Sequence, residues 1–199
     1  MSSQFWDDRY RGDEYAYGRE PNEFLRAEAH RIAPGRVLCL AEGEGRNAVF
    51  LAGLGHEVTA VDFSAEGIRK TERLAREKNV KVETVQADLA TYEPRLEAFT
   101  GVIAIFAHLP ASVRKHVHGW ISRALTPGGV LVLEAYTPAQ LAFNTGGPRD
   151  PALLMTLAGL KEELAPLTFE VGREVEREIH EGAFHGGPSA TVQVVAVRR

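Results

Sequence analysis

Residues 37–47 read Val-Leu-Cys-Leu-Ala-Glu-Gly-Glu-Gly-Arg-Asn, and this stretch decides the fold. An apolar run leads into two glycines, Gly43 and Gly45, and a segment of helical composition, residues 47–54, follows. This order predicts a short buried strand, a tight turn and a helix. Glycines in such a turn let the backbone approach a ligand closely, and the first N–H groups of the helix attract an anionic group.

Strands and helices alternate on both sides of this stretch. The predicted strands cover residues 36–41, 57–62, 80–86, 101–106 and 130–136. Helices are expected at residues 22–32, 47–54 and 64–78, with Ser64 as the cap of the third, and from Pro110 to about residue 125. This rhythm predicts a parallel sheet with helices on both faces.

The last third of the chain has a different pattern. Residues 151–164 are typical of a helix, and residues 168–180 alternate between apolar and charged side chains, as in a strand with one wet face. Residues 190–197 are apolar on both faces, so this strand should lie inside the sheet. Because the link at residues 182–188 is too short for a parallel crossover, these two strands should be antiparallel. We therefore expect an α/β fold, a doubly wound Rossmann-like seven-stranded sheet, mostly parallel with an antiparallel last strand.

The chain has 199 residues, which suits one domain. We expect that domain at residues 36–199, preceded by an N-terminal cap or lid segment at residues 1–35. Four aromatic side chains of the segment are suited to covering a ligand: Trp6, Tyr10, Tyr15 and Tyr17. A loose arm and a dimer contact are the alternatives.

Composition excludes several classes of protein. The net charge of −4 argues against nucleic acid as the main partner, and the sequence shows neither a membrane span nor a signal peptide. Cys39 is the only cysteine, which rules out an internal disulfide and a cysteine-rich zinc site. His180, Glu181 and His185 lack the spacing of a zinc motif, so no metal is expected. We expect a cytoplasmic monomer or homodimer that acts on a small-molecule substrate, with no membrane partner.

Asp62 closes the second predicted strand, 17 positions beyond Gly45, where a carboxylate can hold ribose hydroxyls. A nucleotide-like ligand is therefore predicted. The spacing Gly43-x-Gly45-x-x-Ala48 also matches a dinucleotide fingerprint. Against a dinucleotide, about 35 residues precede the first strand and no second domain remains for a dehydrogenase substrate. The run Gln86-Ala87-Asp88-Leu89 also places an acid where an adenine amino group is read.

These features together resemble a class I S-adenosylmethionine-dependent methyltransferase. The resemblance covers residues 36–199 and is carried by the glycine loop, Asp62, Ala87-Asp88-Leu89, Pro127-Gly128-Gly129 and the antiparallel last strand. More narrowly, the chain resembles the tellurite-resistance and thiopurine methyltransferase branch. That likeness is carried by Phe5-Trp6-Asp7, Tyr17-Gly18, Pro21-Asn22, Gly45-Arg46-Asn47, His108-Leu109-Pro110, Glu181-Gly182 and His185-Gly186.

The resemblance implies S-adenosylmethionine as the cofactor, S-adenosylhomocysteine as its product, and no metal. The residues it implies for cofactor binding are Tyr17, Ala41, Glu42, Gly43, Gly45, Arg46, Asn47, Asp62, Phe63, Ser64, Ala87, Asp88, Leu89 and Phe106. It implies His108 and Tyr17 as catalytic residues. Asp62 would hold the ribose, Phe63 one face of the adenine, and Asp88 the adenine amino group. The alternatives are a cap for the helix at Ser64, core packing and a turn acid, respectively.

The chain departs from the family at two positions. Cys39 stands where the family carries an acid, and Ala41 stands at the first loop glycine. Glu42 or backbone carbonyls are then expected to hold the methionine ammonium. Arg46 is expected either to pair with the methionine carboxylate or to be solvated at the surface. His185 is expected in a surface turn, and it reaches the site edge only if that turn folds inward.

The Asn-Pro-Pro-Tyr signature of nucleobase methylation is absent after the fourth strand, which favours a small acceptor with a soft nucleophile, such as a thiol or a reduced selenium or tellurium species. A minimal NAD(P)-binding oxidoreductase and a catalytically idle cofactor-binding member of the fold are the alternatives.

Overall fold

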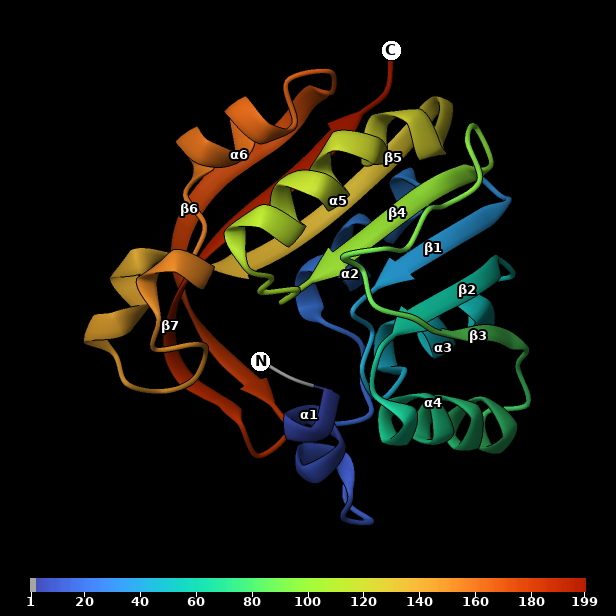
Figure 1. The fold of residues 1–199 in the computed structure, drawn as a ribbon, viewed down its shortest axis with the longest axis vertical. Helices are drawn as coiled ribbons and strands as arrows, with labels where there is room; N and C mark the ends of the chain where they lie inside the picture. Colours follow the sequence, from blue (N-terminus) through green and yellow to red (C-terminus); the bar gives the residue numbers. More distant parts are fainter. Residues whose placement is uncertain (1–2) are drawn as a thin grey trace.

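The computed structural model describes residues 3–199, and these form one seven-stranded sheet in the order β3-β2-β1-β4-β5-β7-β6 (Figure 1). The strands are β1 (Arg36–Leu40), β2 (Glu57–Asp62), β3 (Val82–Gln86), β4 (Phe99–Ile105), β5 (Leu125–Tyr136), β6 (Thr168–Glu181) and β7 (His185–Val197). β1 pairs in parallel with β2 and β4, whereas β7 runs antiparallel to both β5 and β6. The predicted doubly wound sheet is confirmed.

Helices cover both faces of the sheet. They are α1 (Ser3–Tyr10), α2 (Glu23–Glu28), α3 (Arg46–Gly53), α4 (Ala65–Glu77), α5 (Ala111–Ala124) and α6 (Leu157–Glu163), with 3-10 turns η1 (Ala29–Arg31), η2 (Pro138–Ala142) and η3 (Pro151–Leu153). Figure 1 shows α5 and α6 on the face toward the viewer, with α2 and α3 behind the sheet. Two apolar cores follow from this arrangement. Trp120 and Leu160 belong to the core on the near face, and Leu25 and Leu51 belong to the core on the far face.

The β6–β7 hairpin is longer than the sequence pattern predicts. Only residues 182–184 link the two strands, and pairing extends to Glu181 opposite His185. As expected from its two apolar faces, β7 lies inside the sheet. The hairpin continues past the other strands toward α1 (Figure 1). This arm therefore brings residues near the end of the chain to the N-terminal segment.

Two helix predictions need correction. The predicted helix at 151–164 is split, because Leu154 is extended and the Met155 N–H donates to Tyr136 O instead of continuing a helix. Thr156 then caps α6 by accepting from the Gly159 N–H at 3.1 Å. The structure also contains a helix, α1, in a segment whose apolar side chains show no helical period. The predicted Ser64 cap of α4 is confirmed by its hydrogen bond from the Gly67 N–H at 3.0 Å.

Within residues 3–199, none of the helices combines the length and the apolar character that a membrane crossing requires.

Candidate active site

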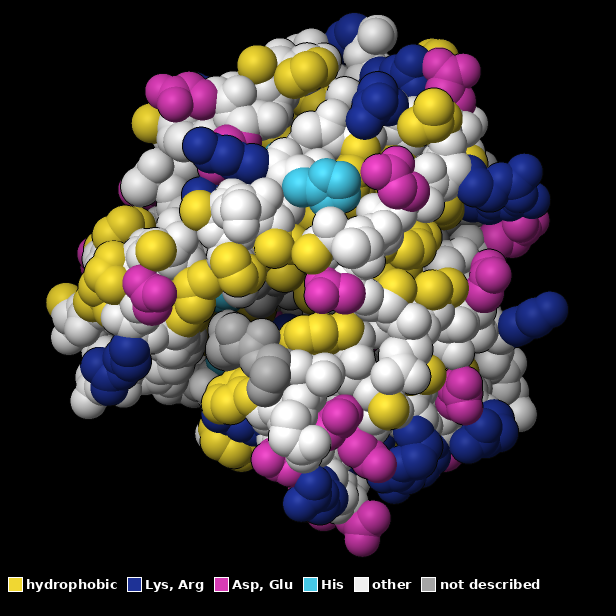
Figure 2. Space-filling view, in the orientation of Figure 1, with side chains coloured by type: hydrophobic (Ala, Val, Ile, Leu, Met, Phe, Trp, Pro, Cys, Tyr) yellow, Lys and Arg dark blue, Asp and Glu magenta, His cyan; other side chains and the backbone are white. Residues whose placement is uncertain are grey.

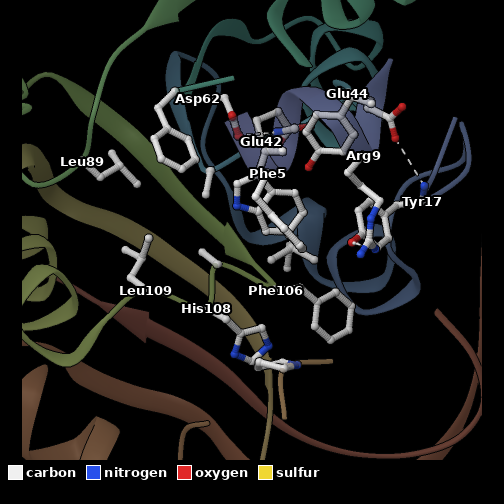
Figure 3. A pocket seen from close by; sticks show the side chains of 18 of the residues that line it. Phe5, Arg9, Tyr17, Glu42, Glu44, Asp62, Leu89, Phe106, His108 and Leu109 are labelled. Atoms are coloured by element: carbon white, nitrogen blue, oxygen red, sulfur yellow. Dashed lines mark hydrogen bonds between the residues drawn. The ribbon is translucent and has the colours of Figure 1, made fainter. Parts of the chain in front are cut away.

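A cavity of about 490 Å³ opens at the carboxyl edge of the parallel strands (Figure 3). Ala41, Asp62, Ala87 and Phe106, at or just beyond the ends of β1, β2, β3 and β4, all line it. This edge is where open α/β sheets bind ligands. The other walls come from α1, from the segment around Tyr17 and from the tip of the β6–β7 hairpin. The volume lies in the range that encloses a small organic ligand.

The glycine loop owes its path to close packing against α4. Gly43 and Gly45 have φ of +66° and +91°, in the left-handed region that favours glycine. A Cβ on Gly45 would lie 2.7 Å from Thr71 Cα, so this position admits no side chain. Ala41, two positions before Gly43, also takes a left-handed conformation, with φ of +48°. The loop therefore keeps a glycine-like path at Ala41 at the cost of local strain.

Asp62 joins the end of β2 to the glycine loop. Its Oδ2 accepts from the Gly43 N–H at 2.8 Å, and its Oδ1 accepts from the Ser64 N–H at 2.9 Å. Burial raises the pKa of Asp62, and the backbone N–H groups oppose that rise. Each oxygen of an ionised carboxylate has a second lone pair, so Asp62 can also accept from ligand hydroxyls in the cavity.

Glu42 caps α3 from within the loop. Its Oε1 accepts from the N–H groups of Asn47 and Ala48, both at 2.9 Å. Burial raises the pKa of Glu42 to about 7, against the lowering effect of these bonds and of Arg46. The carboxyl therefore changes its charge near neutral pH while facing the cavity.

Arg46 supplies an unsatisfied donor to the cavity. Its Nη2 donates to Glu181 Oε2 at 2.7 Å, with both side chains buried. Its Nη1 is buried and has no hydrogen-bond partner among residues 3–199. A buried guanidinium donor without a partner is costly, and an anionic ligand group would satisfy it. Arg46 therefore suits the carboxylate of a ligand.

A buried ion pair holds the N-terminal segment against the loop. Lys70 is fully buried, lies 2.7 Å from Glu44 Oε1, and donates to the Glu14 carbonyl at 2.6 Å. The Tyr17 N–H donates to Glu44 Oε2 at 3.3 Å, the dashed line in Figure 3. Burial raises the pKa of Glu44, whereas Lys70 lowers it. These contacts fix Tyr17 at the cavity wall.

His108, a predicted catalytic residue, lines the cavity with both ring nitrogens engaged. Its Nδ1 bonds to the Leu153 carbonyl at 2.9 Å, and its Nε2 accepts from the Tyr136 N–H at 3.2 Å. Burial lowers its pKa to about 4. In this conformation His108 is a neutral wall residue with no nitrogen left for proton transfer. Its catalytic role stays a prediction, and the geometry does not favour it.

His185 lies in the cavity wall, and its expected place in a surface turn is wrong. Its ring centroid is 4.5 Å from that of Tyr17 and 4.6 Å from that of Phe106. The hairpin tip folds inward because the Ala183 N–H donates to the Ala16 carbonyl at 3.0 Å. His185 Nδ1 lies 3.7 Å from Glu181 Oε2 and has no hydrogen-bond partner within the described chain. Burial lowers the pKa of His185, so the ring is neutral at pH 7.

Most of the predicted site residues meet in this cavity. Those that line it are Tyr17, Ala41, Glu42, Gly43, Arg46, Asn47, Asp62, Phe63, Ala87, Asp88, Leu89, Phe106 and His108. Gly45 and Ser64 do not line it; they are the N-cap residues of α3 and α4. Of the four predicted lid aromatics, Tyr15 packs over Lys70 and Arg73 instead.

Sequence reasoning missed Phe5, Arg9, Phe184 and His185 as lining residues. A motif search can propose His185 and Phe5, which lie in matched motifs, but no local pattern indicates Arg9 or Phe184. Within residues 3–199, no group of three metal-ligating side chains is present.

Comparison with known proteins gives one family and one fold. Residues 37–129 match the family described as a methyltransferase domain. No curated protein sequence matches the chain.

Among solved structures, the chain is similar over its full length to a protein described by the conversion of a disulfide bond into a thioacetal group during echinomycin biosynthesis. That likeness has 21% identity, 92% coverage of that chain and a TM-score of 0.81. A methyltransferase from Methanosarcina mazei shares 17% identity over 90% of this chain and 98% of its own, with a TM-score of 0.71. TehB from Haemophilus influenzae shares 19% identity over 99% of this chain and 67% of its own, with a TM-score of 0.66.

At these identities the solved structures establish the fold, and the family match covers its central part, from β1 into β5. The [4+2]-cyclase SpnF also has this fold, with 16% identity over 98% of this chain and 94% of its own and a TM-score of 0.73. Residues 37–129 therefore resemble a methyltransferase domain, and the whole described chain has the fold of S-adenosylmethionine-dependent methyltransferases.

Proposed function

We propose that this protein transfers a methyl group from S-adenosylmethionine to a small molecule with a soft nucleophile, such as a thiol or a reduced selenium or tellurium species. The observation that carries the proposal is Asp62, which holds the glycine loop through the Gly43 N–H while it faces the cavity. This is the arrangement that a ribose-binding acid requires, because one carboxylate fixes the loop and still accepts from hydroxyls.

The residues present fit the cofactor. Arg46 offers a buried unpaired donor for the methionine carboxylate, and Glu42 offers a carboxyl for the ammonium. Asp62 would hold the ribose. Asp88, Phe63 and Leu89 line the remaining wall, where the adenine is expected. When bound, S-adenosylmethionine supplies a methyl group on a positively charged sulfur, and S-adenosylhomocysteine remains after transfer.

The other walls align the acceptor and exclude water. Phe106, Leu109 and Val113 form an apolar side of the cavity, and α1 covers it from the opposite direction. Excluding water and fixing the direction of attack are the main requirements of such a transfer. A soft nucleophile needs no strong base, which agrees with two neutral histidines in the wall.

One structural neighbour supports a sulfur acceptor, because it is described by the conversion of a disulfide bond into a thioacetal group. The cavity volume favours a small molecule over a nucleic acid.

Calorimetric titration with S-adenosylhomocysteine and NADP, followed by a methyl-donor assay on thiols, selenite and tellurite, tests the proposal. We expect S-adenosylhomocysteine to bind, NADP not to bind, and at least one acceptor to be methylated. NADP binding in place of S-adenosylhomocysteine would favour the minimal oxidoreductase. Binding of S-adenosylhomocysteine without transfer to any acceptor would favour a member of the fold that only holds the cofactor.

A further inference from the structure

Arg9 places a positive charge at the mouth of the cavity without a carboxylate partner among residues 3–199. Its Cζ lies 4.1 Å from the ring centroid of Phe184 and 5.3 Å from that of Phe5. Its Nη1 donates to the Tyr17 hydroxyl at 3.2 Å, its one hydrogen bond to a described side chain. The next arginine along the chain, Arg11, pairs with Asp8. Because a guanidinium carries five N–H donors, most of those on Arg9 are left for a ligand.

Three of the acids that line the cavity already hold parts of the protein itself. Glu42 holds the start of α3, Glu44 pairs with Lys70, and Asp62 holds Gly43 and Ser64. Arg46 adds a second cation to the lining, and the Tyr17 hydroxyl accepts from Arg9. These two guanidinium groups offer cationic donors in this part of the cavity. A ligand that fits it brings negative charge.

The surroundings of Arg9 also restrict the shape of that ligand. Phe5 and Phe184 are large apolar side chains that remain 42% and 45% exposed at the mouth. Figure 2 shows hydrophobic side chains gathered beside a hollow on this face. Stacking between two rings limits the freedom of the guanidinium, so less entropy is lost when it pairs with an anion. Aromatic walls favour a flat apolar body.

We infer that the methyl acceptor carries its soft nucleophile on a flat apolar body with a carboxylate, and that Arg9 pairs with this carboxylate. The inference rests on the proposed function, because Arg46 is assigned to the cofactor and only Arg9 is left for the acceptor. It makes α1 part of the acceptor site.

The test compares two matched probes, 2-naphthoate and 2-naphthamide, by calorimetry with the protein saturated with S-adenosylhomocysteine. We expect the wild-type protein to bind the carboxylate at least about tenfold more tightly than the amide. Arg9→Gln should abolish this preference, Arg9→Lys should retain part of it, and Arg11→Gln, a neighbouring exposed arginine, should leave it unchanged. Circular dichroism and melting temperature show that each variant is folded.

The inference is overturned if the wild-type protein binds both probes equally or neither, or if Arg9→Gln keeps the preference. Failure of S-adenosylhomocysteine to bind in the first titration would overturn the proposed function instead. The two failures are therefore distinguishable.

Discussion

Asp62 and Glu42 each hold the protein's own backbone at the rim of the cavity while presenting a carboxyl group to it. Such acids combine two roles, because the hydrogen bonds that fix the loop also set the orientation of the ligand-binding oxygen. Removing either side chain should therefore change both ligand affinity and local stability. Effects on the two quantities should appear together at Asp62, where two backbone N–H groups would lose their acceptor.

Asp62→Ala should weaken S-adenosylmethionine binding at least about tenfold, or about 1.4 kcal/mol. It should also lower the free energy of unfolding, by about 1–3 kcal/mol for each buried N–H left unpaired. Calorimetry and denaturant unfolding measure the two effects. Asp13→Ala removes an acid whose side chain is fully exposed and should change neither. Unchanged affinity in Asp62→Ala would remove this residue from the site.

Glu42 should make cofactor binding depend on pH. Because its pKa is raised to about 7, its carboxyl is largely neutral below pH 7 and ionised above. Affinity for the cofactor, whose ammonium it faces in our proposal, should rise as pH increases from 6 to 8. Glu42→Gln should remove this dependence. Calorimetry of wild type and Glu42→Gln from pH 6 to 8, in buffers of equal ionic strength, measures this dependence. If affinity rises equally with pH in both proteins, another group causes the effect.

The raised pKa of Glu42 also makes the free energy of unfolding depend on pH. This free energy should fall as pH rises, whereas cofactor affinity should increase. The folded-state pKa of Glu42 lies above its ordinary value of 4.5, so the folded protein holds a proton that the unfolded chain releases. The stability that this group contributes is present below pH 4.5 and is lost as pH rises through about 7. The cofactor-free protein should therefore gain stability at pH 8 from Glu42→Gln. Asp62 also disfavours the ionised carboxyl, whereas Arg46 favours it.

The positions of the glycine-loop residues could be predicted from the sequence, because they all lie in one continuous segment with a clear strand and helix pattern. Gly43, Arg46 and Asp62 follow from the strand–turn–helix–strand order, which also determines where parallel strands end. Arg9 and His185 were not predictable in the same way. Their places depend on contacts between the two ends of the chain, which no local period encodes.

The β6–β7 hairpin is the element that joins these two ends. At its tip, Gly182 has φ of +68°, and a Cβ there would collide with the backbone of Ala16 and Gly18. The tip therefore needs glycine both for its conformation and for its contact with the N-terminal segment. The hairpin arm acts as a wall of the cavity only while this contact holds.

Gly182→Val should lower the free energy of unfolding by about 1–3 kcal/mol and weaken acceptor binding more than cofactor binding. The reason is that the hairpin tip carries His185 and Phe184, whereas the glycine loop is far along the chain and remains intact. Gly186→Ala is the matched control, because a Cβ there meets no atom within 4 Å. Equal stability of the two variants would show that the tip tolerates displacement.

At the scale of elements, period and breaker residues predicted all seven strands and the antiparallel direction of the last one. They failed where a tertiary contact overrides local preference, as at Leu154 and Met155, where a hydrogen bond to Tyr136 interrupts the expected helix. They also failed at α1, which is helical because it packs against α4 and the loop, with Asp7 accepting from Ser64 Oγ at 2.6 Å. Its own sequence has no apolar stripe.

Across the whole molecule, residues 3–20 close the cavity over the edge of the sheet. Two side chains of this segment, Tyr10 and Ala16, are buried. Its role as a lid stays a prediction. If the segment is a lid, it must open to admit a ligand, and α1 must then leave its place against α4.

Truncation of the chain to begin at Tyr10 should lower turnover at least about tenfold, a loss of the water exclusion that α1 provides. It should lower the melting temperature by only a few degrees, because Tyr10, Ala16 and the Lys70–Glu44 pair remain. In the full chain, S-adenosylhomocysteine should slow hydrogen exchange of residues 5–20. Full activity of the truncated protein together with ligand-independent exchange would contradict the lid and favour an assembly contact.

The contact between the two ends of the chain also determines which part of the cavity can fold first during translation. Asn22 bonds to Glu181 across 159 residues, and β7 must be complete before its hairpin can dock. A nascent chain that has emerged as far as β5 already holds the glycine loop and Asp62, but it lacks the hairpin wall. Long-range closure of this kind is slow, and domains form from the N-terminal side as the ribosome releases them. The part of the cavity formed by the glycine loop and Asp62 is thus able to form during translation, whereas the part walled by the hairpin is assembled only after β7 has left the ribosome.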